Sequence, residues 1–408
     1  MKRIAIFGSY NSTCTGDTAI FMGLANACRQ IHGQNARLEA LAAGTLNLET
    51  EFTQLGLGPP CNQTRVIKPS LVWRAQKRVG RWIGVQDDPA AQLVTKQVSQ
   101  SLKRADSLLI GGGNLIMDIY PFWPHVLNRV CRIARSLDVP YAFVGVGAGP
   151  ISLEISRTLL SECLQHARSI WFRDQHSLAV CQRMLDMPNA VVAPDLAFGL
   201  RDFCVPRNLM GRSRVMAVNV AGVFGPSWPE HNPKKYQAYL RAMGNLTKAL
   251  SQVQNVTKVI VYDSNRTADS QASKAFVNEL HNAGIVATVT HIQKQMTVRE
   301  TIDLCTRADL ALVTRLHAGI LAHLAGCRLI AVAYQPKVAD VMTEHGMTRA
   351  FIELNDLIGN RGTIADLPDL IAKSHSHRTL VGSDDVTSSL RSCLETLEPA
   401  HTDNGSAT

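Results

Sequence analysis

The sequence predicts an α/β protein made of two doubly wound domains, and two observations support this class. Strand-like apolar runs alternate with loops and periodic helices along most of the 408 residues, a pattern that requires mainly parallel sheets. A polar, basic stretch at 201–214 interrupts the alternation and divides it into two sets. We therefore expect a first domain over 1–205, a second over 206–395 and a disordered tail over 396–408.

The first domain is expected to begin with a strand at 3–7, the turn GSYNSTCTGD and a helix at about 18–31. Short apolar runs bounded by turn residues predict further strands at 107–110, 141–146, 169–172 and 191–192. Helical spacing of apolar residues predicts helices at 126–137, 152–166 and 176–185. The segment 44–69 is expected to be irregular, and 70–104 mostly helical and basic.

The second domain repeats the same alternation. Its strands are expected at 215–220, 257–262, 286–291, 309–313 and 329–333, and its helices near 234–252, 269–283 and 297–306. Two domains of this kind face each other across a cleft, into which the loops after the strands open.

The stretch from Asp309 to Lys337 carries the most chemistry. A buried strand ends just before Arg315 and His317, and the next strand ends at Tyr334 and Lys337. Because open α/β sheets bind ligands at the carboxyl ends of their strands, these side chains should meet in one crevice. Two cations, an imidazole and a phenol there predict an anion site with a proton donor.

Two glycine-rich turns follow strands of the first domain. The first contains Gly111, Gly112, Gly113 and Asn114, and the second contains Gly147 and Gly149. Glycine allows a backbone to approach a ligand closely and to adopt positive φ. These positions therefore either line the cleft or form tight turns without a ligand.

The composition limits the partners. A formal charge of +9 favours acidic partners, while 6% aromatic residues and no basic block interleaved with aromatics argue against nucleic acid. A basic cluster surrounds Trp73 and Trp82 and consists of Arg74, Lys77, Arg78 and Arg81. It is interpreted either as a solvated helix face or as a docking surface for a membrane or a lipid-linked acceptor.

The cysteine pattern and hydropathy point to a cytoplasmic protein, at most peripheral at the inner membrane face. The ten cysteines show no CxxC and no regular spacing, which is typical of reduced, mostly buried thiols. The amino terminus has no apolar run long enough for a signal peptide, and no span of 18 apolar residues occurs.

Five stretches resemble the polysaccharide pyruvyl transferase family in the family's order. They are GSYNSTCTGDTAI near the start, GGGNLIMD at 111–118, VGVGAGPI at 144–151, FRDQHS at 172–177 with PDLAF at 194–198, and RLHAGILAHLAG…AYQPKV at 315–338. The first departs from the family's Gly-Asn-rich text at 12–15, so only Gly16 and Asp17 are carried over from it.

This resemblance implies a fold like that of GT-B glycosyltransferases, with two Rossmann-like domains facing a cleft. It also implies transfer of a pyruvyl group from phosphoenolpyruvate onto two hydroxyls of a sugar, forming a cyclic ketal in exopolysaccharide or cell-surface polysaccharide biosynthesis. The implied partners are phosphoenolpyruvate as donor and a saccharide acceptor, free or linked to a nucleotide or lipid diphosphate.

The resemblance assigns roles in this chemistry to four basic residues of the sequence. Phosphoenolpyruvate needs cations, and the candidates are Arg315, Arg173 and Lys337. Arg173 has a second interpretation, a salt bridge with its neighbour Asp174. His317 is either the general acid or an anion-binding group.

Carboxylates that could deprotonate or bind the acceptor hydroxyls are Asp17 and Asp118, with Asp195 a third candidate. Each could instead cap a helix or hold a loop. No HExxH, DxD pair or other metal-ligand spacing is present, so we expect no metal and no cofactor.

Three other functions remain open. A GT-B glycosyltransferase with a nucleotide-sugar donor would use the same basic groups for a diphosphate. A non-catalytic sugar-phosphate-binding or scaffold protein would bind without turnover. A dinucleotide oxidoreductase fits less well, because the first turn reads GSYNSTCTG rather than GxGxxG.

Overall fold

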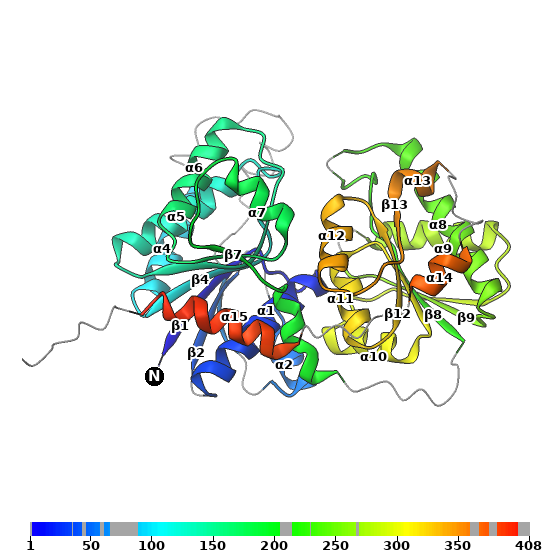
Figure 1. Cartoon of the computed structure of the whole chain (residues 1–408), viewed down its shortest axis with the longest axis horizontal. Coiled ribbons are helices and arrows are strands. Elements are labelled where there is room, and N and C mark those ends of the chain that lie inside the picture. Colours follow the sequence, from blue (N-terminus) through cyan, green and yellow to red (C-terminus); the bar gives the residue numbers. More distant parts are fainter. Residues whose placement is uncertain are drawn as a thin grey trace, which may run out of the picture.

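The chain folds into two parallel α/β sheets flanked by helices, which confirms the predicted fold class (Figure 1). The computed structural model describes residues 2–34, 36–42, 46–57, 61–65, 89–204, 214–228, 230–266, 269–359, 367–374 and 382–398. The basic cluster around Trp73 and Trp82, the predicted boundary at 205/206 and residues 399–408 of the predicted tail lie outside these residues. The tail was predicted from 396, but Leu397 is buried in the core, so that start is too early.

The first sheet has the strand order β3-β2-β1-β4-β5-β6-β7, with all neighbours parallel. Its strands are β1 (Arg3–Gly8), β2 (Arg37–Ala42), β3 (Asn62–Arg65), β4 (Ser107–Ile116), β5 (Tyr141–Ala148), β6 (Ile170–Phe172) and β7 (Ala190–Val192). The accompanying helices are α1 (Thr15–His32), α2 (Leu48–Leu55), α4 (Pro89–Leu102), α5 (Trp123–Ser136), α6 (Glu154–Gln165), α7 (Gln175–Gln182) and the 3-10 helix η2 (Leu196–Phe203).

The second sheet has the order β10-β9-β8-β11-β12-β13, again all parallel. Its strands are β8 (Val215–Asn219), β9 (Lys258–Tyr262), β10 (Thr288–Ile292), β11 (Leu310–Val313), β12 (Arg328–Ala333) and β13 (Phe351–Glu353). The helices that follow β8 are α8 (Pro233–Val253), α9 (Ser270–Asn282), α10 (Val298–Arg307), α11 (Leu316–Leu324), α12 (Pro336–Glu344), α13 (Leu354–Ile358), α14 (Leu367–Lys373) and α15 (Ser383–Glu395).

The two sheets share one topology. In each, the order reverses beside the first strand, so that β1 pairs with β4 and β8 pairs with β11. Ligands of open parallel sheets bind at such a reversal. The turn before Asp17 follows β1, and Arg315 follows β11, so both lie at these positions.

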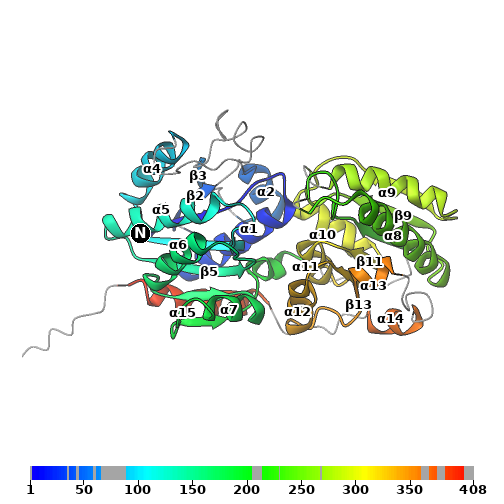
Figure 2. The same ribbon diagram turned by 90° about the horizontal axis from the view of Figure 1, so that it is seen from above.

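The last helix, α15, does not belong with the second domain, where the sequence analysis placed it. It packs against α1 and η2 of the first domain and is seen there in both views (red in Figures 1 and 2). Val386 and Leu390 of α15 are fully buried, because the apolar face of this helix packs against the first domain. This packing explains why the chain comes back to the first domain after the second.

The domains are joined by a continuous apolar core. One cluster of buried side chains contains members of α1 and η2 together with members of α10 and α11. Polar contacts reinforce the junction at the start of α1, where the Thr15 N–H donates to the Ser264 carbonyl at 2.9 Å and the Thr15 hydroxyl donates to the Met296 carbonyl at 3.0 Å. The groups on the two sides of the boundary are therefore held in fixed positions.

All ten cysteines are free thiols. Among the described residues, no helix has the length and apolar character needed to cross a bilayer.

Candidate active site

Strand β11 brings Arg315 to the boundary between the domains. All four residues of β11 are buried, and the Thr314 hydroxyl that follows lies 2.8 Å from the Tyr239 hydroxyl. Arg315 then begins α11 as its extended N-cap residue, and its N–H donates to Asn219 Oδ1 at 3.3 Å. The backbone of Arg315 is thus fixed before its side chain makes any contact.

The Arg315 guanidinium is held by a buried carboxylate. Nε donates to Asp269 Oδ2 at 3.1 Å and Nη2 donates to Asp269 Oδ1 at 2.6 Å, while the Trp228 ring centroid lies 5.9 Å from the guanidinium carbon. Burial alone would lower the pKa of Arg315, but the charge of Asp269 outweighs it and raises that pKa above its ordinary value. With 21% of its side chain exposed, Arg315 offers a permanent, oriented positive charge.

His317 stands between the two domains. It lies in the first turn of α11, with Nε2 3.5 Å from Asp195 Oδ2 of the first domain. Its ring also packs against the start of α1, where a Cβ atom added to Gly16 would lie 2.7 Å from His317 Nδ1. The imidazole is 18% exposed, which leaves a path for a substrate.

Asp195 supplies a fixed negative charge beside His317. Its Oδ1 accepts the Ala197 N–H at 3.0 Å, and its Oδ2 lies 3.2 Å from Arg173 Nη1. Burial would raise the pKa of Asp195, but His317 and Arg173 hold it below its usual range. Asp195 is therefore an ionised carboxylate that can orient the imidazole.

Arg173 lies behind Asp195 rather than in the open cleft. Its residue is 3% exposed, and it pairs with Asp174 at 3.6 Å as well as with Asp195. The salt bridge with Asp174, one of the two interpretations of the sequence, is present. Asp174 in turn caps α7 by accepting the Ser177 N–H at 2.7 Å. This placement favours a supporting role for Arg173 over direct contact with a substrate.

Asp17 is the carboxyl best suited to exchange a proton here. It lies in the first turn of α1, and burial raises its pKa from 3.8 to about 6. The charges of His317 and Arg315 and a contact with the Cys14 thiol oppose that shift, which places all three groups near the carboxyl. A carboxyl that titrates near neutrality matches the requirement for a general base.

Asp118 has a different environment. Its Oδ2 accepts the N–H groups of Ser152 and Leu153, each at 2.7 Å, and the residue is 7% exposed. Two backbone amides thus occupy the carboxylate and fix the turn that leads into α6. This geometry favours a role for Asp118 in holding the loop over a role in binding or deprotonating the acceptor.

The first glycine-rich stretch was predicted as a turn but lies within β4, where it allows strands and helices to pack closely. Gly112 has φ of +75°, and a Cβ atom there would lie 1.8 Å from Cγ2 of Ile20 in α1. A Cβ atom at Gly111 would lie 2.4 Å from Cγ2 of Val144 in β5. Gly113, with φ of +73°, has open space on its Cβ side, where the nearest atoms lie 4.0 Å away.

The second glycine-rich stretch, also predicted as a turn, has Gly147 within β5 and contacts the charged cluster directly. A Cβ atom at Gly147 would lie 2.9 Å from Asn114 Oδ1 and 3.0 Å from Arg173 Nη2. Asn114 Nδ2 donates to the Gly149 carbonyl at 2.8 Å, and its Oδ1 is buried with no hydrogen-bond partner among the described residues. Of the predicted binding positions in these turns, Asn114 and Gly147 thus lie beside Arg173.

The predicted group at the end of β12 is only partly described. Lys337 falls in the first turn of α12, but its side chain is outside the described residues. The Tyr334 ring packs edge-on against Trp228, with ring centroids 5.5 Å apart. Trp228 therefore joins Tyr334 to Arg315.

Several residues of the site were not identified from the sequence. Asp269, Asn219 and Trp228 all contact Arg315. Asn219 is the last residue of the buried strand β8, whereas Asp269 and Trp228 lie in loop segments without a distinctive pattern. Asp269 is 46 residues away from Arg315, and no local pattern marks it among the polar residues after β9.

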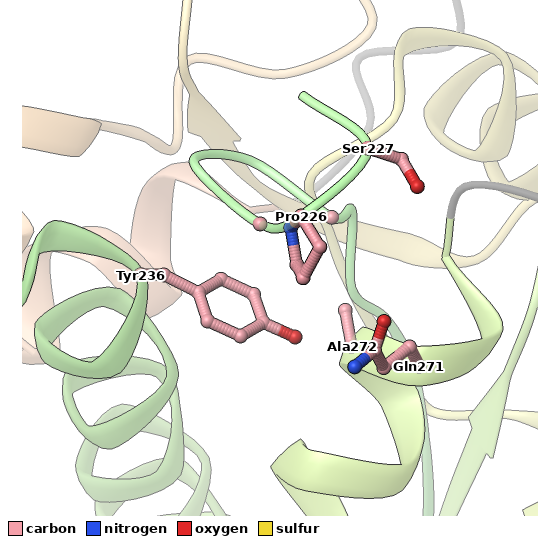
Figure 3. A pocket seen from close by; sticks show the side chains of 7 residues that line it. Pro226, Ser227, Tyr236, Gln271 and Ala272 are labelled. Carbon is pink, nitrogen blue, oxygen red and sulfur yellow. The ribbon is translucent and has the colours of Figure 1, made fainter. Parts of the chain in front are cut away.

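A small pocket adjoins this pair (Figure 3). Seven residues line about 230 Å³ of space that includes open solvent: Gly222, Gly225, Pro226, Ser227, Tyr236, Gln271 and Ala272. The Gly222 N–H donates to Asp269 Oδ1 at 3.0 Å, so the same loop forms the pocket and holds the partner of Arg315. Among the described residues, no group of three or more His, Cys, Asp or Glu side chains could hold a metal ion.

Solved structures identify the class of fold. The chain is similar to UDP-GlcNAc 2-epimerase from Neisseria meningitidis, at 12% identity and a TM-score of 0.57, with 97% of this chain and 100% of that chain covered. The putative UDP-N-acetylglucosamine 2-epimerase from Listeria monocytogenes gives 9% identity and a TM-score of 0.61, with 97% and 96% covered. The epimerase from Methanocaldococcus jannaschii gives 12% and 0.59, with 97% and 100% covered. At these identities the likeness shows the fold alone, a two-domain architecture of the GT-B type.

The family follows from the sequence model of polysaccharide pyruvyl transferases, which matches residues 15–336. This chain belongs to the polysaccharide pyruvyl transferase family, which confirms the resemblance found in its five stretches. The matched range includes Asp17, Arg173, Asp195, Arg315 and His317. No curated protein matches the chain.

Proposed function

We propose that this protein transfers a pyruvyl group from phosphoenolpyruvate to two hydroxyls of a saccharide and forms a cyclic ketal. The observation that carries the proposal is the arrangement at the domain boundary. There Arg315 and His317, at the start of α11, face the carboxyl groups of Asp195 and Asp17 on the other domain. Membership of the family supports a saccharide acceptor.

Arg315 suits the donor. Phosphoenolpyruvate carries a phosphate and a carboxylate, and the planar fork of arginine binds either anion through two parallel N–H donors. The position of Arg315 at the N-terminus of α11 adds the partial positive charge of that helix end. Both features favour a small dianionic or trianionic ligand at this point.

His317 and Asp17 suit the proton transfers. In the first step His317 gives a proton to the vinyl carbon of the donor, while the Asp195 carboxylate, 3.5 Å from Nε2, orients the ring. A sugar hydroxyl then bonds to the neighbouring carbon and loses its proton to Asp17. The bond from that carbon to the phosphate oxygen breaks, and phosphate leaves with the proton that Asp17 had accepted. The second hydroxyl then closes the ketal and loses its proton to His317, which restores both groups.

The proton balance makes a direct test possible. One solvent-exchangeable proton ends in the new methyl group, so a reaction in D2O should place one deuterium there. We expect wild-type protein with phosphoenolpyruvate and a panel of free, nucleotide-linked and lipid-linked saccharides to release phosphate and form this singly labelled ketal.

His317→Ala should reduce the rate by about 10²–10⁴-fold, the usual contribution of general acid catalysis. Consumption of a nucleotide sugar without phosphate release from phosphoenolpyruvate would instead identify a glycosyltransferase. An active His317→Ala protein would assign the imidazole to anion binding alone.

A further inference from the structure

The contact between Asp269 and Arg315 uses only part of the guanidinium. Nε and Nη2 donate to the two carboxylate oxygens in a side-on arrangement. A guanidinium has five N–H donors, so three remain, on Nη1 and Nη2 along its end. Within the described part of the chain, the side chain of Arg315 donates hydrogen bonds to Asp269 alone.

Asp269 is held in place independently of Arg315. It is fully buried, and its Oδ1 also accepts the Gly222 N–H at 3.0 Å. It directly precedes α9, whose N-terminus carries partial positive charge. The charge of Asp269 is thus shared among three donors, and Arg315 is not fully neutralised by the pair.

A second group restricts the guanidinium plane. The Trp228 ring lies 5.9 Å from the guanidinium carbon, and Tyr334 packs edge-on against Trp228. An arginine held at one edge and close to an aromatic ring loses little freedom when it binds an anion, because its orientation is already set.

We propose that Asp269 is a positioning residue, which holds Arg315 side-on so that the end of its fork is presented to the donor anion. This inference rests on the proposed function, because it takes phosphoenolpyruvate as the anion. Asp269 itself touches no substrate. It acts through the orientation of Arg315.

The test is a titration of wild-type, Asp269→Asn, Arg315→Ala and double-variant proteins with phosphoenolpyruvate, followed by phosphorus NMR. Asparagine keeps the shape and an acceptor for the Gly222 N–H but turns an N–H toward Arg315. We expect Asp269→Asn to weaken binding roughly ten- to a hundredfold, the loss typical of groups that orient a binding ligand.

The effect of Asp269→Asn on phosphoenolpyruvate affinity should change direction when Arg315 is absent. In Arg315→Ala, Asp269 is an unpaired negative charge that repels the donor, so adding Asp269→Asn should leave affinity unchanged or improve it. A merely structural effect of Asp269→Asn would weaken binding in both backgrounds. Asp263→Asn is the control for loss of a nearby buried carboxylate. Asp263 is 2% exposed in the same domain and pairs with His291 instead of Arg315, so this variant should bind as wild type.

The outcomes separate the two claims. Failure of wild type to bind phosphoenolpyruvate would overturn the proposed function. Arg315-dependent binding in wild type, with Asp269→Asn as tight or tighter, would overturn the positioning role alone. Should Asp269→Asn not fold, Arg315→Lys decides, because lysine keeps the charge without the fork, and wild-type affinity in that variant would show that orientation is irrelevant.

Discussion

Asp17, Arg315 and His317 acquire their properties from burial and from one another. Arg315 and Asp195 are held in their charged forms by fixed partners, so neither changes charge near neutrality. Asp17 is different, because burial raises its pKa to about 6 and nearby cations only partly offset that rise. The site thus contains one carboxyl able to take up a proton between charges that stay constant.

Asp17→Asn should abolish the acidic limb of the pH–rate profile. A base with a pKa of about 6 is ionised above that pH, so the wild-type rate should rise as pH increases through about 6. Asparagine cannot accept the proton, and we expect a loss of about 10²–10⁴-fold in phosphate release from phosphoenolpyruvate. Asp118→Asn is the control and should retain the limb, since backbone amides occupy that carboxylate. An unchanged limb in Asp17→Asn would assign the base elsewhere.

Local patterns were sufficient to find some of these residues and not others. Arg315 and His317 could be found because a buried strand followed by a helix places the intervening residues at the sheet edge. Their partners Asp269 and Asp195 could not be assigned, because each contact joins segments far apart in the chain and depends on tertiary packing. Arg173 shows the ambiguity directly, since its neighbour Asp174 was a visible alternative partner and is an actual one.

At the scale of elements, the site depends on how α1 meets α11. The start of α1 lacks a side chain at Gly16, and the His317 ring fills that space. A larger residue would have to displace the His317 side chain, because its Nδ1, Cγ and Cβ atoms lie 2.7–2.9 Å from the added Cβ position.

Gly16→Ala should therefore reduce activity strongly while leaving the protein folded. The displaced imidazole would lose its alignment with Asp195, and misplacement by about 1 Å can cost on the order of 10²-fold in rate. The matched control is Gly244→Ala within α8, where the nearest atoms to the new Cβ lie at 3.4–3.5 Å. It should be active and slightly more stable, because alanine favours helix. Full activity in Gly16→Ala would contradict this packing.

Elements with strong periodicity were predicted closely, and those without it were missed. The five strands expected in the second domain all occur within two residues of their predicted bounds. β2 was missed because its sequence RLEALA consists largely of residues that favour helices, and pairing with β1 overrides that preference.

At the scale of the whole molecule, the two domains are tied together by polar contacts as well as by their shared core. Glu51 of α2 is 5% exposed, and its Oε2 accepts the Val298 N–H at the start of α10 across the boundary, at 3.0 Å. Burial raises the pKa of Glu51 from 4.5 to about 7, although this hydrogen bond opposes the shift. Burial therefore favours the protonated acid of Glu51, and it outweighs the hydrogen bond, which favours the carboxylate.

Glu51→Gln should stabilise the protein at alkaline pH. A carboxyl whose folded pKa is raised contributes its stability fully below about pH 4.5 and loses it as pH rises through about 7. Glutamine mimics the protonated form, so the variant should nearly match wild type at pH 5 and exceed it at pH 8 by roughly 2–3 kcal/mol. Thermal midpoints at both pH values check this, with Glu49→Gln on the exposed side of α2 as control. A difference in thermal midpoint between Glu51→Gln and wild type that is no larger at pH 8 than at pH 5 would contradict the burial argument.

The return of α15 to the first domain shows the limit of sequence reasoning at this scale. The helix follows the second domain along the chain, and its apolar face does not reveal which surface covers it. The burial of Val386 and Leu390 in the structure shows that α15 packs on the first domain.

The most direct measurement is the thermal midpoint of wild type and Arg315→Ala, with and without phosphoenolpyruvate and with UDP-GlcNAc as comparison. A ligand that binds only the folded state raises the midpoint by mass action. We expect phosphoenolpyruvate to raise the midpoint of wild type and to raise that of Arg315→Ala far less at the same concentration. Stabilisation by UDP-GlcNAc and none by phosphoenolpyruvate would contradict a donor site for phosphoenolpyruvate at Arg315.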